Sequence, residues 1–311
     1  MKILITGATG FVGRHLVKSL KNQGVELTLV ARSSHINQSN IRYLYSDLNT
    51  NFDWQSSLTD CDIVIHLAGR AHVMKEEAGN PYQAYAEINI EATKRLAEQA
   101  ALYGVKRFIF LSSVKVNGEI TDSVAFTETD IPQPEDDYGK TKYEAEKALS
   151  VIAKETGMEV VIIRPPLVYG TGVKANFKNL IKLSHLSIPL PFGAIHNKRS
   201  LIYIENLIDF IVLCTHHPKA ANETFLISDD ADVSTTQLIK YIREANGQKS
   251  WLLPVPKSWL TCVFKLIGKS SLSDRLCGNL QVDITKAKTL LNWKPPYSVK
   301  EGIARTVSND K

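Results

Sequence analysis

Residues 2–13 read KILITGATGFVG, and this stretch decides the fold. Its first apolar run, KILIT, predicts a buried strand, and a helical pattern starts at Phe11. Gly7, Gly10 and Gly13 belong to the turn that leads from the strand into the helix. A glycine-rich turn at this point lets the backbone approach a pyrophosphate, which rests against the free N–H groups at the start of the helix. A tight turn without a ligand is the alternative, but the position between strand and helix favours a dinucleotide site.

The same alternation of short apolar runs and helical patterns continues along the first half of the chain. Continuous apolar strands separated by helices are typical of a parallel sheet covered on both faces. With right-handed crossovers, the pattern predicts an α/β fold, a doubly wound parallel sheet of the Rossmann type. The expected strands are 2–6, 26–31, 41–47, 62–69, 107–113 and 159–170, and the main later helices are 82–104 and 140–157.

The alternation weakens in the second half, which predicts a smaller C-terminal substrate-binding lobe. We expect residues 1–170 to form the dinucleotide-binding domain, with 201–230 returning to it. Residues 171–200 and 231–311 would then form the lobe. The apolar segment 251–268 contains two prolines and two lysines, so it is too interrupted to span a membrane. A helix of the second lobe is favoured there over a contact with a membrane surface.

Composition argues against several classes of function. The formal charge of +5 arises from 37 basic and 32 acidic residues without a dominant basic run, which argues against a nucleic-acid-binding protein. The cysteines have no CxxC spacing, so neither a metal site nor a disulfide framework is indicated. The start of the chain does not resemble a signal peptide, and no uninterrupted apolar stretch of about 18 residues occurs. We therefore expect a cytoplasmic protein with reduced thiols.

The end of the second strand bears on the choice of dinucleotide. NAD-binding folds place Asp or Glu there for the ribose hydroxyls, whereas NADP-binding folds use Arg for the 2′-phosphate. Arg32 follows this strand and no acid does, which favours NADP over NAD, with a solvated loop cation as the other interpretation. Asp47 and Leu48 follow the third strand, where an adenine would lie. The small residues of HLAG (66–69) suit a backbone that passes beside a cofactor.

The stretch YGKTK (138–142) carries the candidate chemistry. Tyr138 and Lys142 lie one helical turn apart, so their side chains share a face. A tyrosine with a pKa near 10 is a poor acid or base at neutral pH, and we expect Lys142 to lower that pKa by stabilising the phenolate. Ser112 and Ser113 end the preceding strand, at the sheet edge where ligands bind in such folds. A serine, a tyrosine and a lysine suit proton exchange with an alcohol or ketone beside a nicotinamide.

Five motifs together resemble one protein family. TGATGFVG, HLAG, the serine before VKVNG, YGKTK and RPPLVYG are similar to the extended short-chain dehydrogenase/reductase family, in the branch of UDP-glucose 4-epimerase. The resemblance covers essentially the whole chain. It implies a nicotinamide dinucleotide in the N-terminal lobe, a UDP-sugar in the C-terminal lobe, and a homodimer through the helices at 82–104 and 140–157.

The resemblance also assigns individual residues. It gives catalysis to Ser113, rather than Ser112, together with Tyr138 and Lys142, and it makes Asn89 either a structural residue below the site or a direct participant. No metal is implied. The cofactor contacts expected from the loop and the resemblance are Gly7, Gly10, Phe11, Val12, Gly13, Arg32, Asp47, Leu48, Leu67, Ala68, Gly69, Tyr138, Lys142 and Pro165. The substrate contacts are Ser113, Tyr138, Asn176, Arg199 and Arg275.

Departures from the family pattern narrow the reaction. Dehydratases of the family carry an Asp-Glu pair just after the catalytic hydroxyl residue, whereas this chain has Val114 and Lys115. Dehydration is disfavoured because no carboxylate is present to eliminate water. Asn117 stands where the family usually has a tyrosine, which changes the wall of the sugar pocket. Asn279 replaces the aspartate of the motif that begins at Arg275, which leaves that nucleotide contact open.

Three functions remain. The finer resemblance is to bacterial reductases of UDP-4-keto-6-deoxy-N-acetylhexosamines in surface-polysaccharide synthesis of the O-antigen type, so a 4-ketoreductase is expected. A 4-epimerase of UDP-hexoses or UDP-N-acetylhexosamines with a retained NAD is the alternative, because it would use the same three residues. A nucleotide-binding regulator without turnover is disfavoured, since Ser113, Tyr138 and Lys142 are all present.

Overall fold

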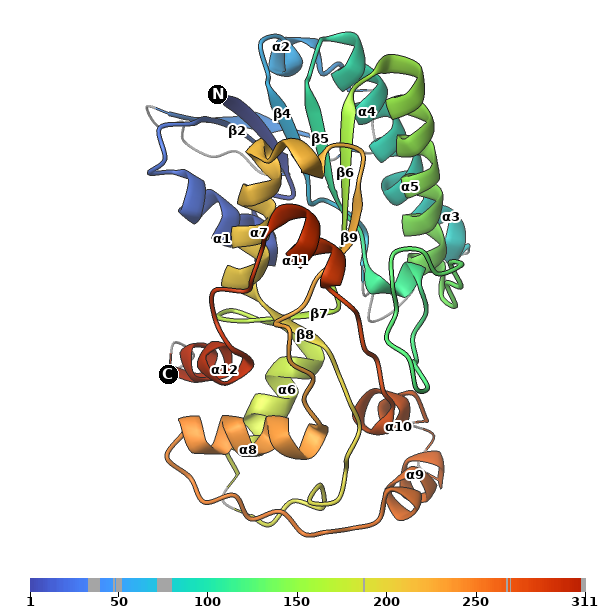
Figure 1. Cartoon of the computed structure of the whole chain (residues 1–311), viewed down its shortest axis with the longest axis vertical. Helices are drawn as coiled ribbons and strands as arrows, with labels where there is room; N and C mark the ends of the chain where they lie inside the picture. Colours follow the sequence, from blue (N-terminus) through green and yellow to red (C-terminus); the bar gives the residue numbers. More distant parts are fainter. Residues whose placement is uncertain are drawn as a thin grey trace.

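A parallel sheet dominates the upper part of the molecule (Figure 1). The structure is a computed structural model that describes residues 1–32, 40–46, 48, 52–71, 80–186, 188–266, 268 and 270–308, with only the backbone at 175, 176 and 270–272. Within these residues seven strands pair in the order β3-β2-β1-β4-β5-β6-β9, all parallel. Their bounds are β1 Lys2–Thr6, β2 Glu26–Ala31, β3 Ile41–Tyr45, β4 Ile63–His66, β5 Arg107–Leu111, β6 Glu159–Arg164 and β9 Thr224–Leu226. The predicted doubly wound α/β fold is therefore confirmed.

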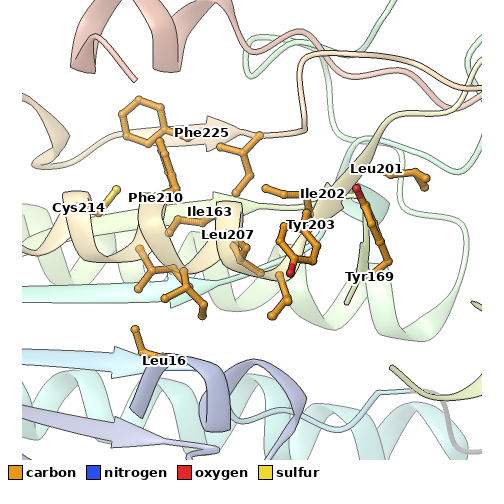
Figure 2. Close-up of a cluster of buried hydrophobic side chains, with 14 of the residues drawn as sticks. Leu16, Ile163, Tyr169, Leu201, Ile202, Tyr203, Leu207, Phe210, Cys214 and Phe225 are labelled. Carbon is orange, nitrogen blue, oxygen red and sulfur yellow. The ribbon is translucent and has the colours of Figure 1, made fainter. Parts of the chain in front are cut away.

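Helices cover both faces of the sheet, because alternate strand residues point to opposite sides. Ile3 and Ile5 of β1 join the core on the side of α1 (Phe11–Leu20) and α7 (Ile204–His216), part of which is drawn in Figure 2. Leu4 joins the opposite core, beneath α4 (Ala92–Leu102) and α5 (Asp137–Thr156). The remaining elements on the first half of the chain are α2 Gln55–Leu58, α3 Pro81–Ala86, the π-helical turn η1 Glu87–Glu91 and the 3₁₀ turn η2 Val114–Val116.

The predicted strand at 159–170 is two strands, and they belong to different sheets. β6 stays in the main sheet, while β7 (Leu167–Tyr169) pairs with β8 (Leu201–Tyr203). Pro165 and Pro166 separate them, and proline has no N–H to donate to a sheet ladder. This break takes the chain out of the sheet and toward the C-terminal lobe.

The C-terminal lobe lies below the sheet in Figure 1 and has a small core of its own. Leu190, Phe192, Ile195, Ile239 and Leu260 are buried in it. The remaining elements are α6 Ala175–Ser184, η3 Pro218–Ala220, α8 Thr235–Ala245, α9 Lys257–Leu266, α10 Ser270–Cys277, α11 Thr285–Leu291 and α12 Val299–Ser308. In the described part of the chain, no helix combines the length and apolar character needed to cross a bilayer.

The division of the chain into two domains stays a prediction. The strand β9 lies within the segment 201–230 and pairs with β6, as a segment returning to the first domain would. The sheet order turns back between β1 and β4, which lie side by side. In open α/β sheets ligands bind at the carboxyl ends of the strands at this point.

Candidate active site

The glycine loop packs so closely that side chains cannot be added to it. Gly7 has a φ of +69°, and a Cβ there would lie 2.7 Å from the backbone nitrogen of Ala68. A Cβ on Gly13 would lie 2.2 Å from the backbone oxygen of Gly7. Among the described residues, no side chain caps the start of α1 at Gly10. The first N–H groups of that helix thus suit the phosphates of a dinucleotide.

A buried histidine ties the ends of β1 and β4 beneath this loop. His66 is fully buried, its Nδ1 lies 2.6 Å from Oγ1 of Thr6, and its Nε2 lies 2.9 Å from Oγ1 of Thr93. Burial and the charge of Lys142 lower the pKa of His66 to about 3, so the ring is neutral at pH 7. The backbone N–H of Ala68 also donates to Thr6. The sequence does not predict this role for His66, since its only local signal is a polar residue at the end of an apolar strand.

Lys142 is held at the carboxyl end of β5. Asp136 caps the N-terminus of α5 by accepting a hydrogen bond from the N–H of Gly139 at 2.8 Å, which explains why this helix begins at Asp137. One turn later Lys142 is buried, and its Nζ donates to the backbone oxygen of Leu111 at 2.9 Å. The same nitrogen lies 4.4 Å from the ring centroid of Phe110. Burial lowers the pKa of Lys142 to about 8.

Tyr138 and Ser113 meet at this edge. They share a side-chain hydrogen bond, which favours the phenolate. Burial and the charge of Asp136 outweigh that bond and raise the pKa of Tyr138 to about 12. The expectation that Lys142 lowers this pKa is therefore wrong for this geometry. The Lys142 Nζ lies 6.0 Å from the tyrosine ring centroid and bonds to the backbone instead.

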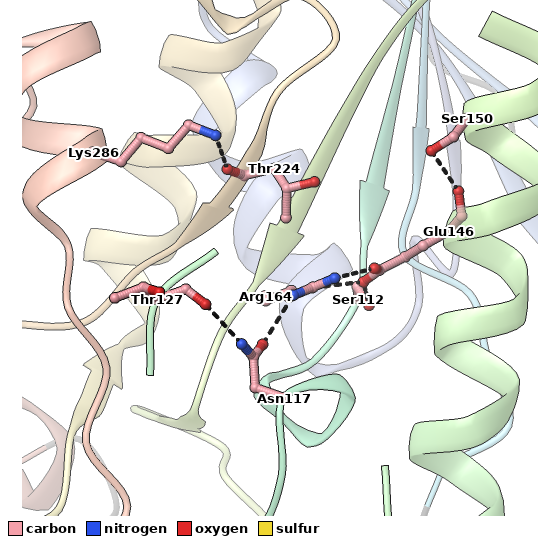
Figure 3. A network of polar contacts seen from close by, with 8 residues as sticks. All are labelled: Ser112, Asn117, Thr127, Glu146, Ser150, Arg164, Thr224 and Lys286. Carbon is pink, nitrogen blue, oxygen red and sulfur yellow. Dashed lines mark hydrogen bonds and ion pairs between the residues drawn. The ribbon is translucent and has the colours of Figure 1, made fainter. Parts of the chain in front are cut away.

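The two neighbouring serines have different partners, as Figure 3 shows for Ser112. Ser112 is buried and donates to the carboxylate of Glu146, which also receives two hydrogen bonds from Arg164. Arg164 in turn donates to Asn117 at 3.0 Å. Ser113 lies outside this network and faces Tyr138. The geometry matches the choice of Ser113 over Ser112, although its catalytic role stays a prediction.

Asn89 joins the loop after β4 to α5. Its side-chain oxygen accepts from the N–H of Arg70 at 2.8 Å, and its side-chain nitrogen donates to Arg70 O and to Thr141 Oγ1, both at 3.1 Å. Asn89 lies in η1, and π-helical turns are frequent at functional sites. A Cβ on Gly69 would lie 3.2 Å from both Asn89 Oδ1 and Lys142 Nζ, so these three residues meet at one point. These bonds favour the positioning role for Asn89.

Lys115 occupies one of the positions where dehydratases carry an acid. Its ammonium donates to Glu119 at 2.7 Å and to Asp136 at 2.5 Å. Burial alone would lower the pKa of Lys115, but the two carboxylates outweigh burial and raise it. A permanent cation therefore occupies the place of the dehydratase acid.

The two candidate arginines for the diphosphate lie in the C-terminal lobe. Arg199 donates to the backbone oxygen of Gly278 at 3.2 Å. Burial and the nearby charge of Arg275 lower the pKa of Arg199, so the two guanidinium groups are neighbours. Gly278 and Asn279 also line a hollow of about 240 Å³ with residues of α9 and α10. Asp122 and Asp274 line this hollow and neither arginine does, so it is the pair of neighbouring cations alone that suits an anionic ligand.

The other predicted contacts differ in where they lie relative to the glycine loop, and two of them cannot be placed. Phe11 and Val12 open α1, Leu67 follows β4, and the oxygen of Pro165 accepts from the N–H of Val114 at 3.0 Å. Arg32 is exposed just after β2. Leu48 has a φ of +66° and donates its N–H to Ser46 at 3.2 Å. Asp47 and the side chain of Asn176 lie outside the described residues.

A glycine loop at the point where the sheet order reverses, beside a Ser-Tyr-Lys group, is the arrangement that the sequence motifs predicted. The model of the family described as "NAD dependent epimerase/dehydratase family" matches residues 3–228. The chain belongs to this family. The family membership expected from the motifs is thus confirmed.

Relatives from this family are similar to the chain over nearly its full length. A Vibrio cholerae protein named UDP-glucose 4-epimerase is 49% identical over 308 residues, which cover 98% of this chain and 94% of that protein. An Escherichia coli O157:H7 protein named N-acetyl-alpha-D-glucosaminyl-diphospho-ditrans,octacis-undecaprenol 4-epimerase is 26% identical, with coverage of 98% and 94%.

Solved structures of the same family share the fold. The UDP-glucuronic acid 4-epimerase of Bacillus cereus, in complex with NAD, has a TM-score of 0.80 at 26% identity and covers 99% of this chain and 98% of its own. The UDP-glucose 4-epimerase of Thermotoga maritima with UDP-glucose has a TM-score of 0.77 at 26% identity, with coverage of 100% and 98%. These family members are epimerases, and the Bacillus structure holds NAD. The finer expectations of a ketoreductase and of NADP gain no support from them.

Proposed function

We propose that this protein is a 4-epimerase of UDP-sugars that retains NAD through the reaction. The observation that carries the proposal is the 49% identity to the Vibrio cholerae UDP-glucose 4-epimerase over 98% of this chain. The Ser113–Tyr138 hydrogen bond beside the buried Lys142 supplies the chemistry that such a reaction needs.

The residues of the first domain fit NAD. The closely packed Gly7–Gly13 turn brings backbone next to the start of α1, where the phosphates would lie. Lys142 would hold the nicotinamide ribose, since its ammonium is buried and lies 6.0 Å from the ring centroid of Tyr138. When bound, NAD supplies the acceptor and donor of a hydride.

Tyr138 and Ser113 would handle the proton at the sugar C4 oxygen. Ser113 orients that oxygen by hydrogen bonding, and Tyr138 accepts the hydroxyl proton in its phenolate form as the C4 hydrogen leaves as a hydride. Burial raises the pKa of Tyr138 to about 12, and the positive charge of an oxidised nicotinamide bound beside it would oppose that effect and favour the phenolate. The product of this half-reaction is a 4-keto sugar. After the sugar turns over, the hydride returns to the opposite face of C4 and Tyr138 gives the proton back. Electrons and protons balance, so no external reductant is needed.

This chain has no carboxylate at the two positions where dehydratases of the family carry an Asp-Glu pair. Val114 is buried and apolar, and the Lys115 ammonium is bonded to Glu119 and Asp136. For the nucleotide, Arg199 and Arg275 would meet the diphosphate near Gly278. Asn279, which replaces the family's aspartate, does not prevent this role. Its side-chain oxygen accepts a hydrogen bond from the N–H of Lys198 at 2.9 Å.

Incubation of the purified protein with UDP-glucose or UDP-N-acetylglucosamine, without added cofactor, tests the proposal. Proton NMR is expected to show the C4 epimer of one of them, and acid extraction is expected to release NAD from the protein. A parallel incubation with a UDP-4-keto-6-deoxy-N-acetylhexosamine and NADPH distinguishes the reductase. Loss of NADPH absorbance there, with no epimer in the first incubations, would replace the epimerase with the ketoreductase.

A further inference from the structure

Large apolar side chains gather at the end of the molecule that lies farthest from the sheet. The helix α9 and the chain leading to it form the lower edge of Figure 1. Here Trp259 is 70% exposed and Leu266 is 80% exposed. The group, termed the end face, consists of Ile188, Trp251, Leu253, Trp259, Val263 and Leu266. Single exposed apolar residues are common on proteins, but six of them on α9 and on the segments next to it are more than scattered exposure, and such groups mark interaction surfaces.

The helix α9 has two apolar sides. Leu260 and Phe264, four residues apart, pack into the core of the C-terminal lobe. Trp259, Val263 and Leu266 follow the spacing i, i+4, i+7, so they share a second side that points to solvent. The inward side accounts for the folding of the helix. The outward side has no such role in the described chain.

A buried arginine fixes the neighbouring part of the end face. Arg243 is 1% exposed and donates hydrogen bonds to the backbone oxygens of Trp251, Leu186 and Ile188. These bonds hold two segments side by side, with Trp251 and Ile188 exposed on their surface. The exposed groups thus stand on an ordered backbone, held by Arg243 and by the bridge between Leu190 and Leu252.

The segment that carries most of the end face has charges of one sign, although Asp122 and Asp274 of other segments line a hollow together with its Lys257. Residues 249–266 contain Lys249, Lys257 and Lys265 and no Asp or Glu. All three lysines are exposed, and none forms an ion pair with a residue that the structure describes. Lys257 and Lys265 lie on the same side of α9 and line an open hollow of about 720 Å³. The basic side of the helix therefore adjoins the apolar side.

We propose that the end face binds the surface of a membrane with anionic headgroups. Helices that lie in a membrane interface combine Trp and aliphatic residues on one side with lysines on the other. Tryptophan in particular favours the boundary between acyl chains and headgroups. Lysine is depleted from protein–protein interfaces, so the same set of residues suits a protein partner less well. The helix lies on the membrane and does not cross it, and the proposal does not depend on the epimerase reaction.

Vesicle sedimentation with the full chain tests the proposal. In about 0.1 M salt, binding to vesicles of phosphatidylcholine with phosphatidylglycerol is expected to be at least about tenfold tighter than to phosphatidylcholine alone, and to weaken as salt rises.

The double variant Trp259→Ser/Leu266→Ser is expected to lower partitioning at least about tenfold. The control Tyr45→Ser/Ile131→Ser removes exposed apolar groups elsewhere and is expected to bind as the wild type does. The double variant Lys257→Gln/Lys265→Gln is expected to lower the affinity for anionic vesicles about fivefold per lysine and to leave the affinity for neutral vesicles unchanged. The control Lys219→Gln, at an exposed lysine outside the end face, is expected to leave both affinities unchanged.

A second measurement needs no variant. Brominated lipids quench tryptophans that enter the interface, and they are expected to quench Trp251 and Trp259 while the buried Trp54 and Trp293 stay bright. Circular dichroism checks that the variants are folded. Absence of binding to anionic vesicles, or binding that the Trp259→Ser/Leu266→Ser change leaves intact, would overturn the proposal. A dimer in solution that this change converts to a monomer would assign the face to a second copy of the chain instead.

Discussion

Ser113, at the carboxyl end of β5, is joined to Tyr138 of α5 by a side-chain hydrogen bond. The two residues are separated by 24 intervening residues in the sequence, and the bond selects one of two adjacent serines. It is the relationship on which the proposed acid–base chemistry depends.

Tyr138→Phe removes the hydroxyl that exchanges the proton and keeps the ring. Turnover is expected to fall by about 10²–10⁴-fold, because general acid–base catalysis contributes on that scale. Dinucleotide binding is expected to persist, since the glycine loop is untouched. NMR of the sugar products and the NAD content of the purified variant measure the two effects. Tyr45→Phe, at an exposed site on β3, serves as the control, and unchanged turnover in Tyr138→Phe would remove the tyrosine from the mechanism.

Ser113→Ala is expected to affect mainly turnover, and Ser112→Ala mainly the free energy of unfolding. The first removes a group that contacts Tyr138 and that also caps η2 by accepting from the N–H of Lys115 at 3.2 Å, so kcat should fall and the free energy of unfolding should drop by about 1 kcal/mol or less. The second removes one of three hydrogen bonds to the buried Glu146 carboxylate and leaves the two from Arg164, and the loss of this bond to a charged group is expected to cost about 1–3 kcal/mol of the free energy of unfolding. Steady-state kinetics and urea unfolding on both variants separate the outcomes. The opposite pattern would make Ser112 the substrate-facing residue.

The Glu146–Arg164 pair is expected to be essential for stability. Both side chains are almost fully buried and share two hydrogen bonds. Arg164→Met leaves the Glu146 charge buried without its partner, which is expected to cost about 3–5 kcal/mol in urea unfolding. The double variant Arg164→Met/Glu146→Leu should recover much of that loss, because it removes both charges. A loss in the single variant no greater than that of an exposed control such as Arg42→Met would contradict this.

Asp136 caps the helix that carries Tyr138 and Lys142. Asp136→Ala is expected to lower the free energy of unfolding by at least about 1 kcal/mol, because the N–H of Gly139 and the ammonium of Lys115 both lose an acceptor. Turnover should fall as well, since the start of α5 positions Tyr138. Asp137→Ala, next to the cap, is the matched control. Thermal unfolding and steady-state kinetics measure the two effects. A lower melting temperature with unchanged turnover would mean that the cap has a structural role only.

The His15–Glu205 pair is expected to make stability depend on pH. Its hydrogen bond, at 2.8 Å, raises the pKa of His15 and lowers that of Glu205. The contribution of His15 is full below its unfolded pKa, near 6.5, and is lost as the pH rises through the raised folded pKa. The contribution of Glu205 is present above about pH 4.5 and is lost as the pH falls through the lowered folded pKa.

Urea unfolding of the wild type and of His15→Gln across the pH range checks this. The difference is expected to be greatest between about pH 4.5 and 6.5, and to stay below about 1 kcal/mol because the pair is partly solvated. A difference that grows above pH 8 would contradict the assigned direction.

Much of the fold and of the candidate site could be predicted from local pattern. Apolar runs and glycine spacing predicted the parallel sheet, and the positions of Ser113, Tyr138 and Lys142 followed from strand ends and helical periodicity. The split of 159–170 was missed, although Pro165 and Pro166 carried a local signal for it. The role of His66 could not be predicted, because its partners Thr6 and Thr93 come from other elements.

The sequence by itself therefore determined the sheet, the glycine loop and the residue types at the site, because strand and helix periods and backbone sterics act over a few residues. Tertiary structure alone decided the direction in which the pKa of Tyr138 is shifted, and it supplies the physical reason for the choice of Ser113 that the family resemblance had made. It also decided that Trp259, Val263 and Leu266 point to solvent although the helix has a second apolar side for the core. These outcomes depend on burial and on partners far away in the chain, and a short stretch of sequence contains neither.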